Sequence, residues 1–187
     1  MGLTSSTIAG CLGCQSEHAF TSHTGAHRQG ARRSKNTPRR NRILFYEKGK
    51  PYYEFTNFSP HSVVYKGKRY PTSEHLFQAF KFIDSHPRLA EHIRTCSDKP
   101  MVAFDEAHKF QSSVRKDWSH VHIEKMDAVL RLKFMQHANL RRLLLSTGNA
   151  ELIEDSPRDW FWGVGADRTG SNELGKALMR LRGELRK

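Results

Sequence analysis

The sequence predicts one α+β domain over residues 43–187, mostly helical with a small antiparallel sheet, preceded by a disordered basic tail at residues 1–42. Short apolar runs separated by turn signals come first in the domain, and longer segments with helical periodicity follow. Strands and helices do not alternate regularly, and no internal repeat is present. This order of elements is typical of an α+β domain.

The tail is rich in Ser, Thr, Gly, Arg and His and contains almost no aliphatic run, which is typical of a disordered segment. It carries seven basic residues and one acidic residue, and therefore +6 of the formal net charge of +12. A dispensable tail is expected. The alternatives are a metal site at Cys11 and Cys14, N-myristoylation at Gly2, and an organelle transit peptide.

The basic composition favours anionic partners, such as nucleic acid, phosphorylated nucleotides or acidic lipid. The three cysteines, Cys11, Cys14 and Cys96, make no disulfide framework, so a reducing compartment is expected. No stretch is long and apolar enough to span a membrane, and no apolar segment near the start indicates a secretory signal. The expected location is intracellular, in the cytoplasm or the nucleus.

The strands predicted at the start of the domain are short. Ile43–Tyr46, Tyr53–Phe58 and Ser62–Tyr65 are runs of apolar and aromatic residues between turn signals. Lys66–Lys68, with a central glycine, is typical of a hairpin turn and leads into Arg69–Tyr70.

Six helices are predicted from apolar residues at three- and four-residue spacing. Proline opens three of them, where its missing N–H costs nothing, and Gly148 ends another as a C-cap. A short strand at Glu151–Glu154 precedes the last helix. The predicted helices span Pro71–Phe82, Pro87–Arg94, Pro100–Gln111, Val121–His137, Leu140–Ser146 and Asn172–Leu185.

The first predicted helix carries two different faces. Opposite its apolar stripe, Glu74, Gln78 and Lys81 line up because steps of four and seven residues are about one and two turns. Phe77 and Phe82 flank this polar row, although large aromatics rarely wall a solvated face. The row therefore suggests the lining of a pocket, and an exposed ion pair beside ordinary core phenylalanines is the alternative.

Two loops have a composition unusual for exposed connections. Phe55–Pro60 places an amide between two phenylalanines, and Ser156–Gly165 concentrates two tryptophans, a carboxylate and two glycines. Tryptophan offers a flat surface for a base, and glycine permits close approach of the backbone to a ligand. Gly170–Asn172 leads into the last helix, whose N-terminus is suited to a phosphate. A buried aromatic corner with turn glycines is the alternative.

Several short motifs stand in one order along nearly all of residues 43–186. They are Phe55–Pro60, Pro71–His75, Phe77–Ala79, Lys81–Phe82, Trp118, Leu143–Gly148, Ser156–Pro157, Asp159, Trp162–Gly163, Gly165, Gly170, Asn172, Leu174–Gly175, Leu178–Met179 and Arg182. Each alone is weak, but together they resemble the NADAR family, which includes bacterial N-glycosidases of riboflavin-pathway intermediates.

The resemblance implies hydrolysis of an N-glycosidic bond between ribose and an amino-bearing base. Substrates in that family include early pyrimidine intermediates of riboflavin synthesis and ADP-ribose attached to guanine in nucleic acid, where hydrolysis reverses a modification. Both are ribosylamines on a flat heterocycle carrying phosphate. No metal and no cofactor are expected.

The expected catalytic residues are Glu74, Lys81 and Asp159. Lys81 would capture the opened sugar as a Schiff base, Glu74 would move protons, and Asp159 would orient the ribose or act as a second acid–base group. In the rival, carboxylate-only route, Asp159 stabilises an oxocarbenium ion and Glu74 handles water, while Lys81 binds phosphate or pairs with Glu74. The expected substrate-binding residues are Asn57, Phe58, Gln78, Trp118, Trp162, Gly163, Gly165 and Asn172.

The expected reaction is removal of ADP-ribose from guanine bases in nucleic acid or nucleosides, because both the tail and the domain are positively charged. An N-glycosidase of ribosylamino-pyrimidine phosphates and a non-catalytic reader of ADP-ribose are the alternatives. Arg131, Lys133, Arg141 and Arg142 are expected to form a basic surface, either a solvated helix face or a contact to a nucleic-acid backbone.

Overall fold

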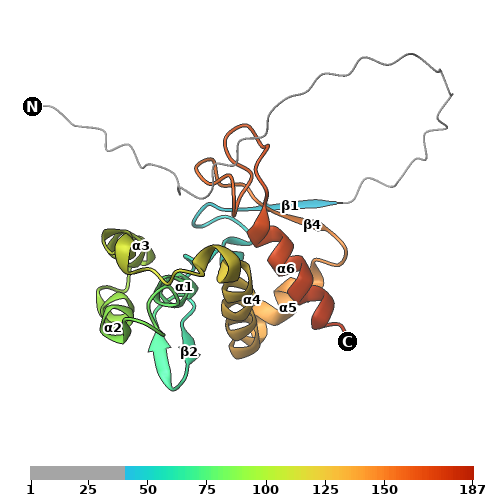
Figure 1. The fold of residues 1–187 in the computed structure, drawn as a ribbon. Coiled ribbons are helices and arrows are strands. Elements are labelled where there is room, and N and C mark those ends of the chain that lie inside the picture. The colour runs from blue at the N-terminus through green and yellow to red at the C-terminus, as the bar shows by residue number, and fades with distance from the viewer. Residues whose placement is uncertain (1–40) are drawn as a thin grey trace, which may run out of the picture.

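The structure of the protein, a computed structural model, describes residues 41–187 (Figure 1). The α+β, mostly helical fold is confirmed. The predictions made for the tail concern residues 1–42, of which all but residues 41 and 42 lie outside the described range. No helix among the described residues has the length and apolar character needed to cross a membrane. The elements are β1 (Arg42–Phe45), the 3₁₀ turn η1 (Tyr53–Phe55), β2 (Val63–Tyr65), β3 (Lys68–Tyr70), α1 (Ser73–Ala79), α2 (Pro87–Thr95), α3 (Pro100–Lys109), the 3₁₀ turn η2 (Gln111–Ser113), α4 (Trp118–Gln136), α5 (Ala138–Ser146), β4 (Glu151–Glu154) and α6 (Glu173–Glu184).

The predicted hairpin is present as the antiparallel pair β2–β3. Its turn residues Lys66 and Gly67 both have positive φ, at 47° and 74°, as a two-residue hairpin turn requires. A second pair was not predicted: β1 lies parallel to β4, with Phe45 opposite Glu154 (Figure 1). This pair joins the first strand of the domain to a segment more than a hundred residues later.

The strand predicted at Tyr53–Phe58 is wrong, because η1 and an irregular loop occupy this segment. Tyr52 has a φ of 66°, which turns the chain, and the following N–H groups bond within the turn, Phe55 N to Tyr52 O and Thr56 N to Tyr53 O. These local hydrogen bonds take the donors that a strand would use for pairing.

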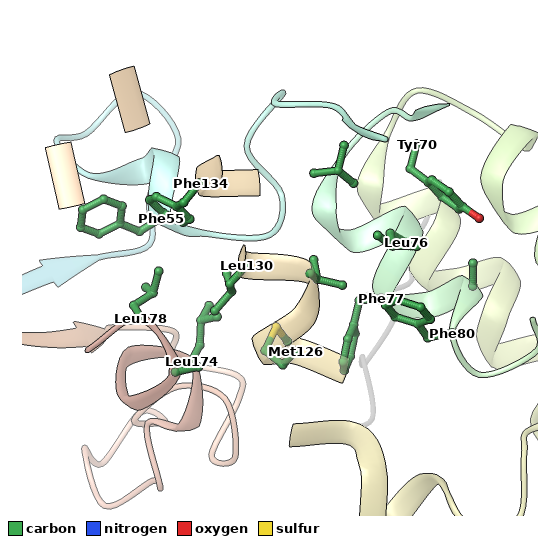
Figure 2. Packing of buried hydrophobic residues seen from close by; sticks show 14 of the residues in the cluster. Phe55, Tyr70, Leu76, Phe77, Phe80, Met126, Leu130, Phe134, Leu174 and Leu178 are labelled. Carbon is green, nitrogen blue, oxygen red and sulfur yellow. The ribbon is translucent and has the colours of Figure 1, made fainter. Parts of the chain in front are cut away.

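Helix α4 is the centre of the core and lies between α1 and α6 (Figure 1). Apolar side chains from all three helices and from the η1 turn form one continuous cluster. Figure 2 shows the part of this cluster around α4, where Met126 and Leu130 lie between the α6 residues Leu174 and Leu178 and the α1 residue Phe77, with Phe55 and Phe134 packed alongside.

Gly175, in the first turn of α6, lets the helix approach β4. A Cβ atom at this position would overlap the carbonyl oxygen of Leu152 and the side-chain amide of Asn172. We expect Gly175→Ala to lower the free energy of unfolding by about 2–3 kcal/mol, measured by chemical denaturation. Gly183→Ala, in the same helix with nothing within 4 Å of its Cβ position, is the control and should be neutral or stabilising by up to ~1 kcal/mol. Equal effects of the two substitutions would contradict this account.

Candidate active site

The polar row predicted on the first helix is buried. Glu74, Gln78 and Lys81 are 6%, 2% and 8% exposed, so they do not form an exposed ion pair. Gln78 Nε2 donates a hydrogen bond of 2.6 Å to Glu74 Oε1. Burial raises the pKa of Glu74, and the hydrogen bond from Gln78 and the charge of Lys81 oppose this rise. Asn57 lies next to them, since its backbone oxygen accepts a hydrogen bond from Glu74 N at 3.2 Å.

Two tryptophans from distant parts of the chain meet over α1. The ring of Phe77 lies 5.2 Å from that of Trp118 at the start of α4, and 5.3 Å and perpendicular from that of Trp162 in the loop after β4. Lys81 Nζ lies 5.7 Å from the centre of the Trp118 ring, within the range of a cation–π interaction. Both tryptophans remain partly exposed, so flat aromatic surface borders the buried polar row.

Asp159 fixes the loop that carries Trp162. Its Oδ1 accepts hydrogen bonds from the backbone N–H groups of Phe161, at 2.9 Å, and of Trp162, at 2.7 Å. Its negative charge also acts on Glu74 and contributes to the raised pKa of that carboxyl group. The three residues expected to be catalytic come from α1, the turn after it and the loop after β4. The ring of Phe77 in α1 links these segments, because it packs against Trp118, which Lys81 contacts, and against Trp162, whose N–H binds Asp159.

The structure adds a third carboxylate, Glu154, the last residue of β4. Burial, followed by the charges of Asp159 and Glu74, raises the pKa of Glu154 to about 8. Its Oε2 atom is enclosed and accepts no hydrogen bond. We call Glu74, Glu154 and Asp159 the carboxylate cluster. Sequence patterns predict Glu154 only as a strand residue; its place at the carboxyl end of a buried strand, just before the Ser156–Gly165 loop, is the one signal that marks it.

Buried polar atoms without a hydrogen-bond partner concentrate at the same place. Within residues 41–187 there are four: Asn57 Oδ1, Ser73 Oγ, Gln78 Oε1 and Glu154 Oε2. Glu154 belongs to the carboxylate cluster, and Asn57 and Gln78 lie beside Glu74. Ser73 directly precedes Glu74 in α1. Because buried polar atoms in folded proteins are nearly always paired, this concentration is what a site for a polar ligand would leave.

Four of the predicted substrate-binding residues make contacts within the protein itself. The Asn172 side chain is used by β4, since its Oδ1 accepts from Glu154 N at 3.0 Å and its Nδ2 donates to Leu152 O at 2.9 Å. A Cβ on Gly163 would lie 2.8 Å from Glu154 O, so this glycine lets the loop pack on the end of β4. Gly165, with φ of 70°, lies under the Trp160 indole, and the Phe58 carbonyl oxygen accepts from the Tyr53 hydroxyl.

A sequence model described as the NADAR domain matches residues 44–186. The chain belongs to the NADAR family. It is 44% identical over 143 residues to "N-glycosidase YbiA" of Escherichia coli K12, an alignment that covers 76% of this chain and 88% of that protein. Its fold is similar to the NMR structure of the E. coli protein YbiA, with a TM-score of 0.72, 41% identity, and 83% and 90% of the two chains covered. It is also 41% identical over 143 residues to "Riboflavin biosynthesis protein VVA0006" of Vibrio vulnificus, covering 76% of this chain and 38% of that protein.

Lys133 of this NADAR domain is predicted to be part of a basic surface. This prediction is wrong, because the side chain is fully buried. Its Nζ donates to Glu54 O at 2.5 Å, to Thr56 O at 2.8 Å and to Ser59 Oγ at 2.7 Å. Burial lowers the pKa of Lys133 to about 7. The lysine therefore anchors the loop that presents Asn57 to Glu74.

A separate open groove of about 350 Å³ lies between β1 and the loop after β4. Gly165 and Arg168 of that loop line it with Lys50, whereas neither Lys81 nor any member of the carboxylate cluster does. Among the described residues of the NADAR domain, no three His, Cys, Asp or Glu side chains are grouped so as to hold a metal ion.

Proposed function

We propose that this protein is an N-glycosidase that releases ADP-ribose from guanine bases. The observation that carries the proposal is the burial of Lys81 beside Glu74, with Asp159 close to Glu74 and two tryptophans bordering the group. A ribosylamine on a flat base needs an amine or carboxylate at the sugar carbon, proton-transfer groups at the ring oxygen and leaving nitrogen, and a flat wall for the heterocycle.

In the favoured route, Lys81 attacks the sugar carbon after ring opening and forms a Schiff base, which water then hydrolyses. Glu74, held by Gln78 and facing the charge of Lys81, moves protons at the ring oxygen. Asp159, fixed by two backbone N–H groups, orients the ribose hydroxyls. Trp118 and Trp162 wall the base, and Asn57 Oδ1 and Gln78 Oε1 are available to its polar edge.

A second candidate substrate is a ribosylamino-pyrimidine phosphate of riboflavin synthesis, which the name of the Vibrio vulnificus relative favours. The same groups would act on its ribosylamine bond. The formal charge of +12 supports the larger, polyanionic substrate. So do the side chains of Trp160 and Phe161, 48% and 39% exposed next to Trp162, because they offer stacking surface beyond a single base.

The deciding experiment incubates the purified full chain, with a chelator present, with an ADP-ribosylated guanine oligonucleotide and separately with the ribosylamino-pyrimidine phosphate. Product release is followed by mass spectrometry. Faster release from the oligonucleotide is the expected result. Preference for the pyrimidine would indicate a glycosidase of riboflavin-synthesis intermediates. Tight binding of either compound without turnover would indicate a non-catalytic reader.

Glu74→Gln is expected to lower kcat by about 10²–10⁴-fold, because the amide keeps the shape of the side chain but cannot transfer a proton. The unfolding midpoint should change little, since Glu74 is buried and the neutral amide avoids the cost of burying a charge. Rates and thermal unfolding of the same preparation provide the test. Glu106→Gln, at a carboxylate in α3 that pairs with Lys109 at 2.6 Å, is the control and should keep wild-type turnover. Turnover by Glu74→Gln at the wild-type rate would remove Glu74 from the mechanism.

A further inference from the structure

We propose that Glu154 is a catalytic residue that protonates the nitrogen of the leaving base. This proposal rests on the proposed N-glycosidase function and adds a group that neither the family resemblance nor the sequence patterns singled out. It rests on three observations about Glu154: how its backbone is held, which hydrogen bonds its carboxyl group lacks, and which charges face it.

The backbone of Glu154 is fixed on both sides. Its N–H donates to Asn172 Oδ1 at 3.0 Å, and its carbonyl oxygen accepts from Val164 N at 3.0 Å. Gly163 packs directly on the same carbonyl group. The residue therefore stands at the end of β4 with little freedom to move, as a proton-transfer group requires.

The three members of the carboxylate cluster differ in their hydrogen-bond donors. Glu74 Oε1 accepts a side-chain N–H, which favours the ionised form of Glu74, and Asp159 Oδ1 accepts two backbone N–H groups. Glu154 Oε2 receives none. An enclosed carboxyl oxygen without a donor, under the negative charges of two carboxylates, is an atom on which a proton is stabilised.

The charged groups around Glu154 reinforce this order. The negative charges of Asp159, in the loop after β4, and of Glu74, in α1, both favour the protonated form of Glu154. The positive charge of Lys81 acts on Glu74 and opposes protonation there. Consistent with this, the pKa of Glu154 is raised to about 8, so the group carries a proton at neutral pH.

The enzyme must supply one proton when the bond between the sugar carbon and the base nitrogen breaks. Lysine attack breaks the bonds from the sugar carbon to the ring oxygen and to the base nitrogen, and forms a carbon–nitrogen double bond to Lys81. Starting from a neutral amine, this step yields a protonated Schiff base, a sugar hydroxyl and a free base amine, and consumes one proton. Hydrolysis of the Schiff base by water then returns that proton. In the carboxylate-only route the leaving nitrogen also gains one proton and water later gives one up, so Glu154 has the same role in both routes.

The test uses the full chain and whichever of the two substrates the wild-type protein turns over. Glu154→Gln is expected to lower kcat at pH 7 by about 10²–10⁴-fold while substrate affinity and the unfolding midpoint stay close to wild type. The wild-type rate should fall as pH rises above about 8, because the acid must be protonated, and the residual rate of the variant should lack this decline. Glu154→Asp keeps the acid and should retain more activity than Glu154→Gln. Glu151→Gln, at the other end of β4 where the carboxylate pairs with exposed Arg42, is the control and should behave as wild type.

Three results would overturn the proposal: a Glu154→Gln rate within about threefold of wild type, a high-pH decline that persists in that variant, or a loss of rate matched by an equal loss of affinity or stability. The first two show that another group supplies the proton, and the third shows a structural role. These results differ from the one expected if the proposed N-glycosidase function is wrong, because the wild-type protein would then turn over neither substrate.

Discussion

Lys81→Ala is expected to abolish turnover and to prevent borohydride trapping of a sugar adduct on the protein. Lys81 is 8% exposed, and two contacts set its position: its backbone oxygen accepts from Arg115 N, just before α4, at 3.0 Å, and its Nζ lies over the ring of Trp118, the first residue of α4. An amine held beside the carboxylate cluster has the placement that Schiff-base formation requires. The loss in kcat should be at least about 10³-fold, since the covalent route is closed.

Lys81→Arg separates the two possible routes. Arginine keeps the positive charge and the contact with an aromatic ring, but its guanidinium does not form a Schiff base. If the lysine acts as a nucleophile, both variants are inactive and neither is trapped. If it only binds phosphate or pairs with Glu74, the arginine variant keeps much of the activity. Lys125→Ala is the matched control, because Lys125 Nζ also lies over an aromatic ring, that of Phe80 at 5.8 Å, and its removal should leave trapping unchanged. Trapping that persists in Lys81→Ala would point to another lysine.

Lys133→Met is expected to lower the free energy of unfolding by about 3 kcal/mol or more. Methionine matches the length and volume of the lysine stem, so no large cavity results. It leaves the oxygens of Glu54, Thr56 and Ser59 without their shared donor, and each buried acceptor left unpaired costs about 1–3 kcal/mol. Since the same loop presents Asn57, kcat should also fall in the folded fraction.

The pH dependence of stability gives a second measurement on this lysine. The pKa of Lys133 is lowered from 10.5 to about 7 in the folded protein. Between these values the unfolded chain binds the extra proton and the folded protein does not, so the contribution of this group to stability rises with pH across that window. The deficit of Lys133→Met relative to wild type should therefore be larger near pH 9 than near pH 6.5, measured by urea unfolding. Lys125→Met, in the same helix but partly exposed, should show neither the deficit nor its pH dependence. A deficit that is independent of pH would show that the lysine stays protonated in the folded protein across this range, and that burial does not lower its pKa.

Local patterns in the sequence predicted much of the fold. Helix positions, the β2–β3 hairpin and the polar row of Glu74, Gln78 and Lys81 all depend on residues a few positions apart, where spacing and turn chemistry are informative. The parallel pairing of β1 with β4 depends on contacts across more than a hundred residues and leaves no local signal. At Tyr53–Phe58 hydrogen bonds within the turn replace the predicted strand, and Lys133 of α4 donates to the Thr56 carbonyl oxygen of this loop, a contact that the local sequence does not indicate.

The candidate site was predicted only in part for related reasons. Charged residues are usually exposed, so composition assigned Lys133 to a surface and gave Glu154 no role. Glu154 stands out only when its neighbours are known, since its raised pKa arises from burial and from carboxylates of two other segments. Asn172 was expected to bind substrate, yet both polar atoms of its amide are used by β4. Which polar atoms remain available for a ligand depends on the complete hydrogen-bond arrangement of the fold.

The parallel pair β1–β4 also has a consequence for how the enzyme is made. Asn57 and Glu74 lie in the first third of the described chain, whereas Glu154 and Asp159 lie near its end. Closing a loop of this length is slow compared with forming α1 or the β2–β3 hairpin, because the entropy cost precedes the contacts that offset it. During synthesis the early residues can therefore complete the proposed site only after β4 and the loop before α6 have left the ribosome.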